Sequence, residues 1–269
     1  MTKTHGGKVN KALPPLFFLG IAMDNTKRFD NKGEIYAKAR PKYSQKLLEH
    51  LKSRSDIPEN AVIADIGSGT GIFTEQLLNA GYKAFAVEPN NDMRKIAEQN
   101  LSGNPNFTSV NGRADSTSLP DNSIDIVTAA QAFHWFDKDL FRAECNRILK
   151  KNGLIILVYN SRIESAECTI ALKELRKKYN PEFNGFSNGI SEDKCKEFFN
   201  DKCEILTYDN SVTYDRKGYI NRVLSSSYSL KKGDEKFNDY LNDINALFDK
   251  YSQNGTLTVP TDTVAYIGK

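Results

Sequence analysis

Two patterns of apolar residues alternate along the first 160 positions of the chain. Short continuous apolar runs, typical of strands buried on both faces, are separated by segments with a helical repeat of apolar positions. The predicted strands are residues 61–66, 82–89, 107–112, 124–130 and 154–160, and the predicted helices are residues 43–52, 72–80, 91–101 and 138–149, the last ended by Gly153. This alternation predicts an α/β fold, with a parallel sheet covered by helices on both faces.

The pattern changes after residue 160. Residues 166–179 are predicted to be helical, and residues 234–253 carry the apolar stripe of an amphipathic helix. Residues 203–215 and 256–268 alternate like strands with one exposed face. We expect these two strands to pair and close the sheet, with the residues between them forming a cap over one end.

The domain boundaries follow from the same pattern. A length of 269 residues suits one domain with an added cap. Residues 1–22 are predicted to be a disordered extension before a natural start at Met23, because their apolar run carries two prolines and is shorter than the ~20 residues that span a bilayer. An export signal is the alternative. Residues 23–269 are predicted to be a single domain, with its core at 56–160 and cap elements at 23–55, 161–200 and 216–255.

Charge and composition narrow the partners. The formal net charge is +3 and no block of Lys and Arg stands out, so neither nucleic acid nor a membrane is an expected partner. The four cysteines form no CxxC pair, and the three histidines have no metal-ligand spacing to them. Reduced thiols and the absence of a dedicated metal site are the expectation.

A glycine-rich turn between the first predicted strand and helix is the main chemical signal. Its glycines, Gly67, Gly69 and Gly71, have the spacing G-x-G-x-G, whereas a dinucleotide turn favours G-x-G-x-x-G. Asp65 just before them would repel a phosphate and attract an ammonium group. Glu88 ends the next predicted strand, where a carboxylate accepts ribose hydroxyls. Ribose and an amino acid without phosphate describe S-adenosylmethionine.

At these residues the chain resembles the class I S-adenosylmethionine-dependent methyltransferases, from about Phe29 to the C-terminus and most specifically over residues 62–160. The family's first motif corresponds to Asp65, Gly67, Ser68, Gly69 and Gly71, and its acidic motif to Glu88, Pro89 and Asn90. Residues 112–125 resemble the third motif, in which Ala114 and Asp115 receive the adenine. Residues 130–137, AQAFHWFD, resemble the small-molecule branch that includes trans-aconitate and quinone methyltransferases. Residues 147–157 resemble its R-x-L-K-P-G-G turn, with Lys151-Asn152 in place of Pro-Gly.

The resemblance implies a three-layer, Rossmann-like methyltransferase fold: a seven-stranded, mostly parallel sheet with one antiparallel strand, plus a helical cap. It implies S-adenosylmethionine as cofactor and S-adenosylhomocysteine as product. The expected activity is in-line methyl transfer to the oxygen, nitrogen or carbon of a small molecule, by a cytoplasmic monomer or homodimer. The alternatives are a non-catalytic S-adenosylmethionine-binding protein and a nicotinamide-dependent reductase.

The candidate site residues have different expected roles. His134 is a candidate general base, or else it orients its loop. The acceptor is expected to meet Tyr43, Phe136, Arg222 and Tyr228, although Tyr43 and Phe136 also suit ordinary packing. The expected cofactor-binding residues are Tyr36, Arg40, Asp65, Gly67, Ser68, Gly69, Gly71, Glu88, Pro89, Asn90, Met93, Ala114, Asp115, Gln131, Ala132 and Trp135.

Overall fold

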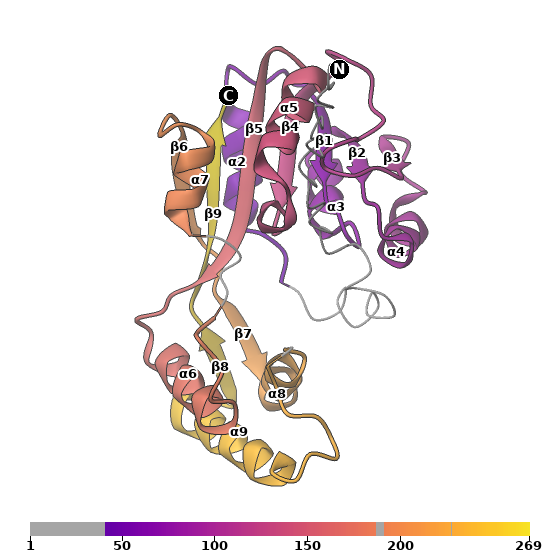
Figure 1. The fold of residues 1–269 in the computed structure, drawn as a ribbon. Coiled ribbons are helices and arrows are strands. Elements are labelled where there is room, and N and C mark those ends of the chain that lie inside the picture. Colours follow the sequence, from indigo (N-terminus) through magenta and orange to yellow (C-terminus); the bar gives the residue numbers. More distant parts are fainter. Residues whose placement is uncertain (1–40, 187–190, 227) are drawn as a thin grey trace, which may run out of the picture.

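A seven-stranded sheet forms the centre of the molecule (Figure 1). The computed structural model describes residues 41–186, 191–226 and 228–269. The strand order is β3-β2-β1-β4-β5-β9-β6, and β9 runs antiparallel to both of its neighbours while the other pairings are parallel. The prediction of a mostly parallel sheet with one antiparallel strand is confirmed. The strands are β1 (Val62–Ile66), β2 (Lys83–Val87), β3 (Phe107–Val110), β4 (Ile124–Ala130), β5 (Leu149–Arg162), β6 (Glu204–Asp209) and β9 (Thr261–Gly268).

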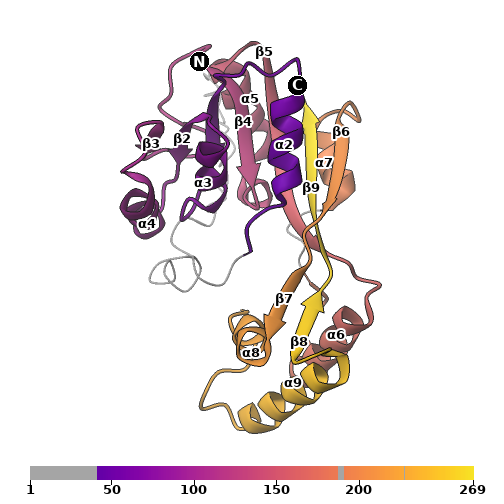
Figure 2. The ribbon, with the colours of Figure 1, turned by 180° about the vertical axis from the view of Figure 1, so that it is seen from behind.

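Helices cover both faces of this sheet. On one face lie α2 (Gln45–Ser53) and α3 (Ile72–Asn79), with α4 (Asn91–Leu101) beside α3 (Figure 2). On the other face lie α5 (Lys138–Ile148) and α7 (Glu192–Phe198), seen in front in Figure 1. Residues 45–53 and 191–200 were expected in the cap, but they pack onto the main sheet. Each segment carries fully or largely buried apolar side chains, and these pack onto the strands.

The cap is a separate layer of structure at the C-terminal ends of the parallel strands (Figures 1 and 2). It consists of a two-stranded sheet, β7 (Val212–Asp215) with β8 (Thr256–Val259), and three helices. These helices are α6 (Glu167–Tyr179), α8 (Arg216–Leu224) and α9 (Phe237–Tyr251). Tyr219, Tyr240 and Phe248 are each at most 2% exposed and lie in a hydrophobic core that the cap forms by itself.

The two alternating segments of the second half pair with each other, as predicted, but they do so as two separate strand pairs. Each is divided: β6 and β9 join the main sheet, whereas β7 and β8 pair within the cap. Pro260 lies between β8 and β9 and has no amide hydrogen for a ladder bond. Its carbonyl accepts a hydrogen bond from the amide of Ile163 at 3.2 Å, at the point where β5 also passes from the core to the cap.

The end of α5 also differs from the prediction. The helix ends at Ile148 and β5 begins directly at Leu149, so Gly153 lies inside a strand. A Cβ atom on Gly153 would lie 2.7 Å from a methyl group of Leu149. This glycine therefore packs closely against Leu149 inside the strand and does not end a helix.

Two further features concern the described part of the chain as a whole. None of its helices has both the length and the apolar character that crossing a bilayer requires. The four cysteines are free thiols, three of them buried.

Candidate functional site

The turn between β1 and α3 brings three left-handed glycines together at the end of the first strand. A Cβ atom on Gly67, at φ 68°, would lie 2.7 Å from the Cβ of Ala132. One on Gly71 would lie 2.8 Å from a methyl group of Leu101. At Gly69, at φ 58°, the nearest described atom would be the sulfur of the buried Met93 at 3.8 Å. Gly67 and Gly71 therefore pack against the protein, and Gly69 is the position that a ligand can approach.

Asp65 lies at the end of β1 but is enclosed, with 1% of its surface exposed. The hydroxyl of Thr74 donates to one carboxylate oxygen at 2.6 Å, and that of Thr128 donates to the other at 2.8 Å. Burial raises the pKa of Asp65 to about 6. The direct contact with an ammonium group that the sequence suggested is not favoured by this arrangement. The carboxylate instead ties α3 and β4 to β1 beneath the glycine turn.

Glu88 follows β2 and reaches the same turn. One carboxylate oxygen accepts the amide of Gly69 at 2.9 Å, and the other accepts the amide of Asn90 at 2.8 Å. Asn90, two residues beyond Glu88 and after Pro89, caps α4 by accepting the amide of Met93 at 3.0 Å. Burial raises the pKa of Glu88. The structure thus joins a buried carboxylate to Gly69, the open glycine of this turn.

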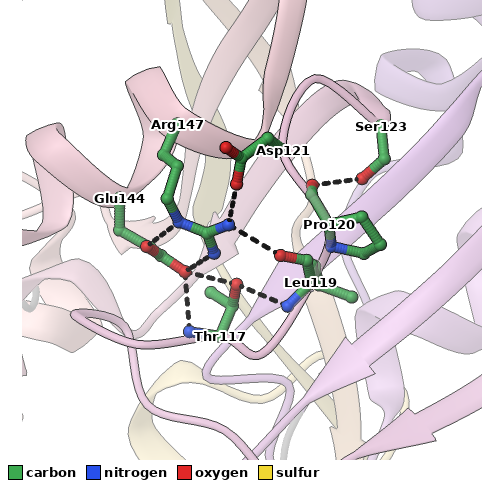
Figure 3. A network of polar contacts seen from close by, with 7 residues as sticks. All are labelled: Thr117, Leu119, Pro120, Asp121, Ser123, Glu144 and Arg147. Carbon is green, nitrogen blue, oxygen red and sulfur yellow. Dashed lines mark hydrogen bonds and ion pairs between the residues drawn. The ribbon is translucent and has the colours of Figure 1, made fainter.

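The loop between β3 and β4, which carries Ala114 and Asp115, is held by a polar network (Figure 3). Glu144 of α5 accepts the amide of Thr117 at 2.7 Å and a guanidinium N–H of Arg147 at 2.7 Å. Arg147 also donates to the carbonyl of Leu119 at 2.9 Å. These bonds fix the loop just after Asp115.

Within this network Arg147 stabilises the charged form of Glu144. The hydrogen bonds from Arg147 lower the pKa of Glu144 to about 2. Asp115 itself is partly exposed and forms an ion pair with Arg113 at 3.0 Å. Ala114 packs against the edge of the core. The loop therefore presents Asp115 outward from an anchored backbone.

The end of β4 has an unusual backbone. Gln131 has a φ of 54°, which is uncommon for a residue other than glycine and is frequent at functional sites. Its amide donates to the carbonyl of Val158 at 2.8 Å, and its side chain donates to the carbonyl of Asn160 at 2.9 Å. Ala132, which follows, is buried against Gly67.

The aromatic segment after β4 includes the short 3-10 helix η2 (Phe133–Trp135). The His134 ring lies 4.6 Å from that of Trp135 and 6.2 Å from that of Tyr159. The Phe136 ring lies 4.9 Å from that of Phe141, and a Cβ atom on Gly67 would lie 3.1 Å from a ring carbon of Phe136. None of His134, Trp135 and Phe136 is among the described residues that line the cleft below. Phe136 is partly buried against the core, and its acceptor contact stays a prediction.

A cleft lies between the C-terminal edge of the main sheet and the cap, with residues of both parts in its lining. Ser68, Gly69 and Gln131 line it from the core, and Tyr43 lines it from the segment before α2. Arg222 lines it from the cap. These five positions were expected from the sequence, and the fold brings them to one space.

Other expected residues lie elsewhere. Tyr228 is 43% exposed, stacks edge-on against Phe183 at 5.3 Å and does not line the cleft. Tyr36 and Arg40 lie outside the described residues. Within those residues no group of three or more His, Cys, Asp or Glu side chains has the arrangement of a metal site.

Two arginines of the cleft, Arg162 and Arg176, were not among the site residues predicted from the sequence. A signal for Arg176 existed: it lies four residues after Leu172 and eight after Cys168, on the buried stripe of α6. A charged residue on an apolar stripe is unusual. Arg162 lies at the end of β5, and no local sequence pattern indicates that this end of the strand lines the cleft beside the cap.

Comparisons with known proteins agree with this geometry. Residues 64–157 match the family model of a methyltransferase domain. An uncharacterized methyltransferase-like protein of Schizosaccharomyces pombe is 29% identical over 161 residues, 60% of this chain and 62% of its own length. An uncharacterized methyltransferase of Mycobacterium bovis is 32% identical over 142 residues, 52% of this chain and 55% of its own. The match thus spans less than two thirds of each relative.

The fold is shared more widely. A solved structure from Anaeromyxobacter dehalogenans, described as a candidate type II methyltransferase, has a TM-score of 0.65 at 18% identity, covering 86% of this chain and 97% of that one. That likeness concerns the fold alone. Together with the family match, it supports one conclusion: residues 64–157 are a methyltransferase domain with the class I fold, and S-adenosylmethionine is its cofactor.

Proposed function

We propose that this chain transfers a methyl group from S-adenosylmethionine to a small-molecule acceptor bound in the cleft beneath the cap. One observation carries the proposal: Gly69, the open glycine of the cofactor turn, lines the same cleft as Arg222 and Tyr219 of the cap. A donor site and an acceptor site that share one space satisfy the main requirement of a displacement reaction, which is proximity of the two reactants.

The described residues fit the cofactor. Gly69 has room for it, and Glu88 supplies carboxylate oxygens of the kind that bind ribose hydroxyls. The buried hydroxyl oxygens of Ser68 and Thr70 have no hydrogen-bond partner within the part of the chain described, and both residues line the cleft. Buried polar atoms require partners, so these hydroxyls favour a polar ligand at the turn. Asp115 would hold the adenine from its anchored loop.

The chemistry needs little from the protein beyond placement. The bound cofactor supplies an activated methyl group on a sulfonium. The cleft then has to hold a nucleophile in line and exclude water, and positioning alone accounts for ~7–11 kcal/mol of barrier in favourable systems. Gln131, with its constrained backbone, and Tyr43 are placed to align the acceptor from the core side.

His134 has a supporting role in this proposal. Its ring lies near those of Trp135 and Tyr159 and is absent from the described lining of the cleft. We therefore assign it to positioning the segment after β4. The proton of a protonated acceptor would leave to solvent or to another group of the cleft.

The position of the cap favours a small-molecule acceptor over a macromolecular one. It closes the C-terminal edge of the sheet with its own hydrophobic core, and Tyr219 and Val223 of α8 face the cleft. An acceptor in this space is surrounded on two sides. On this ground we place the chain in the small-molecule branch of the class I enzymes, as a single domain with an inserted cap.

The test uses the full chain with methyl-labelled S-adenosylmethionine and a cell extract divided into dialysable metabolites, protein and nucleic acid. Label transferred to the dialysable fraction, together with release of S-adenosylhomocysteine, is the expected result. Label in protein or nucleic acid would contradict the proposed acceptor class. Tight binding of the cofactor without transfer to any fraction would instead identify a non-catalytic binding protein.

A further inference from the structure

The cap side of the cleft is basic. Arg162, Arg176 and Arg222 all line it, and the described lining residues include no Asp or Glu. The whole chain has a formal net charge of only +3, with 37 basic and 34 acidic residues. Three guanidinium groups around one cleft are therefore a local concentration of charge that the overall composition does not explain.

Arg176 is the most informative of the three because it is 3% exposed. Its guanidinium donates to the hydroxyl of Ser226 at 2.6 Å and to the carbonyl of Val223 at 3.2 Å, both neutral acceptors. Its Nε is buried and has no hydrogen-bond partner in the described structure. No salt bridge to Arg176 occurs among the described residues. A buried cation without a counter-ion is costly, and proteins normally supply one.

The surroundings hold this guanidinium in place. The rings of Phe183 and Phe186 lie 5.7 Å and 5.5 Å from it, within the range of cation–π attraction. Burial lowers the pKa of Arg176, and the nearby charge of Arg222 acts in the same direction. Both effects oppose the charged state, so an anion bound here would relieve them. The side chain is positioned and charged before any ligand arrives.

We infer that the cap side of the cleft, centred on Arg176 with Arg222 and Arg162 beside it, binds an oxyanion group of the methyl acceptor. This inference rests on the proposed function, because it names the chemical class of the acceptor. The core side of the same cleft is neutral, with Ser68, Gln131 and Asn160 in its lining. The acceptor is therefore a carboxylate- or phosphate-bearing molecule whose anion lies toward the cap and whose nucleophile lies toward Gly69.

The same chemistry could serve the carboxylate of the cofactor, and this is the competing assignment. Substituting Arg176 distinguishes the two assignments, because each predicts that a different ligand loses affinity. Loss of acceptor affinity alone supports the inference, whereas an equal loss of S-adenosylhomocysteine affinity would assign Arg176 to the cofactor and overturn it.

The experiment titrates the full chain, loaded with S-adenosylhomocysteine, with matched pairs of probes. Hexanoate and benzoate are compared with hexanamide and benzamide, and hexyl phosphate with hexanol, by calorimetry. The acids or the phosphate should bind at least about tenfold more tightly than their neutral partners, since a hydrogen bond to a charged group contributes roughly 1.5–3 kcal/mol. A larger preference for the acids would identify the bound anion as a carboxylate, and a larger preference for hexyl phosphate would identify it as a phosphate. Equal binding of all charged and neutral partners would overturn the inference.

Variants locate the anion. Arg176→Gln and Arg222→Gln should each lower the preference for the charged probe by about tenfold, and Arg176→Lys should restore part of it, because it keeps the charge and loses the forked donors. Lys217→Gln removes one positive charge from the exposed side of the same helix as Arg222 and should change nothing. If Arg176→Gln does not fold, Arg222→Gln and Arg176→Lys decide, and an unchanged preference in both would refute the site.

The proposed function can fail separately. A chain that prefers the charged probes but neither binds S-adenosylhomocysteine nor transfers a methyl group would retain the anion site and lose the assigned activity. A chain that transfers methyl groups with no preference for anions would retain the activity and lose this inference.

Discussion

Glu88 accepts a hydrogen bond from the amide of Gly69 at 2.9 Å, and this bond joins the ends of the first two strands at the open side of the cofactor turn. The two residues are adjacent because β1 and β2 pair in parallel, with Ile66 beside Val87. The turn and the carboxylate are therefore one unit, and changes on either side of the bond should affect cofactor binding.

Replacing Glu88 should weaken cofactor binding without unfolding the chain. Glu88→Ala removes a buried acceptor that serves Gly69 and Asn90 and is placed for the ribose hydroxyls. We expect the affinity for S-adenosylhomocysteine to fall at least about tenfold, the effect of losing one hydrogen bond to a charged group. Calorimetry measures it. Glu59→Ala, at an exposed position before β1, is the control, and an equal loss in both variants would contradict the role of Glu88.

Two glycines of the turn should respond differently to a methyl group. Gly67→Ala places a Cβ atom 2.7 Å from that of Ala132 at a positive φ, so we expect roughly 2–5 kcal/mol of destabilisation. Gly69→Ala meets no described atom closer than 3.8 Å and should cost only the backbone strain, about 1–2 kcal/mol, while its methyl group occupies the cleft.

Denaturant unfolding and cofactor titration together test this contrast. Gly67→Ala should lower the free energy of unfolding more, and Gly69→Ala should lower affinity more than its loss of stability explains. Equal stability losses, with cofactor affinity intact in Gly69→Ala, would show that ligands do not approach at Gly69.

The enclosed carboxylate of Asp65 should make stability depend on pH. Its folded pKa, about 6, lies above the ordinary value of 3.8, because burial disfavours the charged form. Its contribution to stability is therefore full below about pH 4 and is lost as pH rises through 6, by on the order of 3 kcal/mol. Asp65→Asn removes this dependence and retains one acceptor oxygen for a threonine hydroxyl, while its NH2 group can donate to the hydroxyl oxygen of the other threonine.

The difference in unfolding free energy between Asp65→Asn and the parent chain, without cofactor, should move in favour of the variant between pH 4.5 and pH 7.5. The exposed Asp139→Asn serves as the comparison. Parallel pH profiles for the parent and Asp65→Asn would mean that Asp65 is not perturbed by its burial.

Glu144 should give the opposite pH dependence. Arg147 lowers its pKa from 4.5 to about 2, so its contribution is present above pH 4.5 and is lost as pH falls toward 2. Glu144→Gln should cost about 1–3 kcal/mol at pH 7, because two donors of the loop at Thr117 and the guanidinium of Arg147 lose a charged acceptor.

The partner variant Asp121→Asn removes only an exposed bond to Arg147 and should cost at most about 1 kcal/mol. Thermal unfolding compares the two. Because the network anchors the loop of Asp115, Glu144→Gln should also weaken S-adenosylhomocysteine binding. An effect on stability with no change in binding would separate the network from the adenine site.

His134→Gln tests the positioning role of the histidine. Removing a general base lowers rates by about 10²–10⁴-fold, whereas a residue that only positions a loop should leave the turnover within about tenfold of the parent. Turnover is measured as release of S-adenosylhomocysteine with an extract that supports methyl transfer. A loss of a hundredfold or more would restore His134 as the base.

The sequence determined most of the sheet and its cofactor turn. A central strand of a parallel sheet is covered on both faces, so its residues are mostly apolar, as in residues 124–130. Such a run can be recognised from the local sequence. The positions of Gly69 and Glu88 were equally readable, because each lies directly after a strand, and the carboxyl ends of parallel strands share one edge.

Only the tertiary structure decided what each side chain faces. Asp65 looked like a ligand-binding carboxylate, but α3 and β4 place a threonine hydroxyl on each of its oxygens. Arg162 lies at the end of β5 and Arg176 lies on α6. Both line the cleft only because the chain passes from β5 into the cap. Contacts between distant segments depend on where the chain turns back, and no local pattern of apolar and polar residues specifies that.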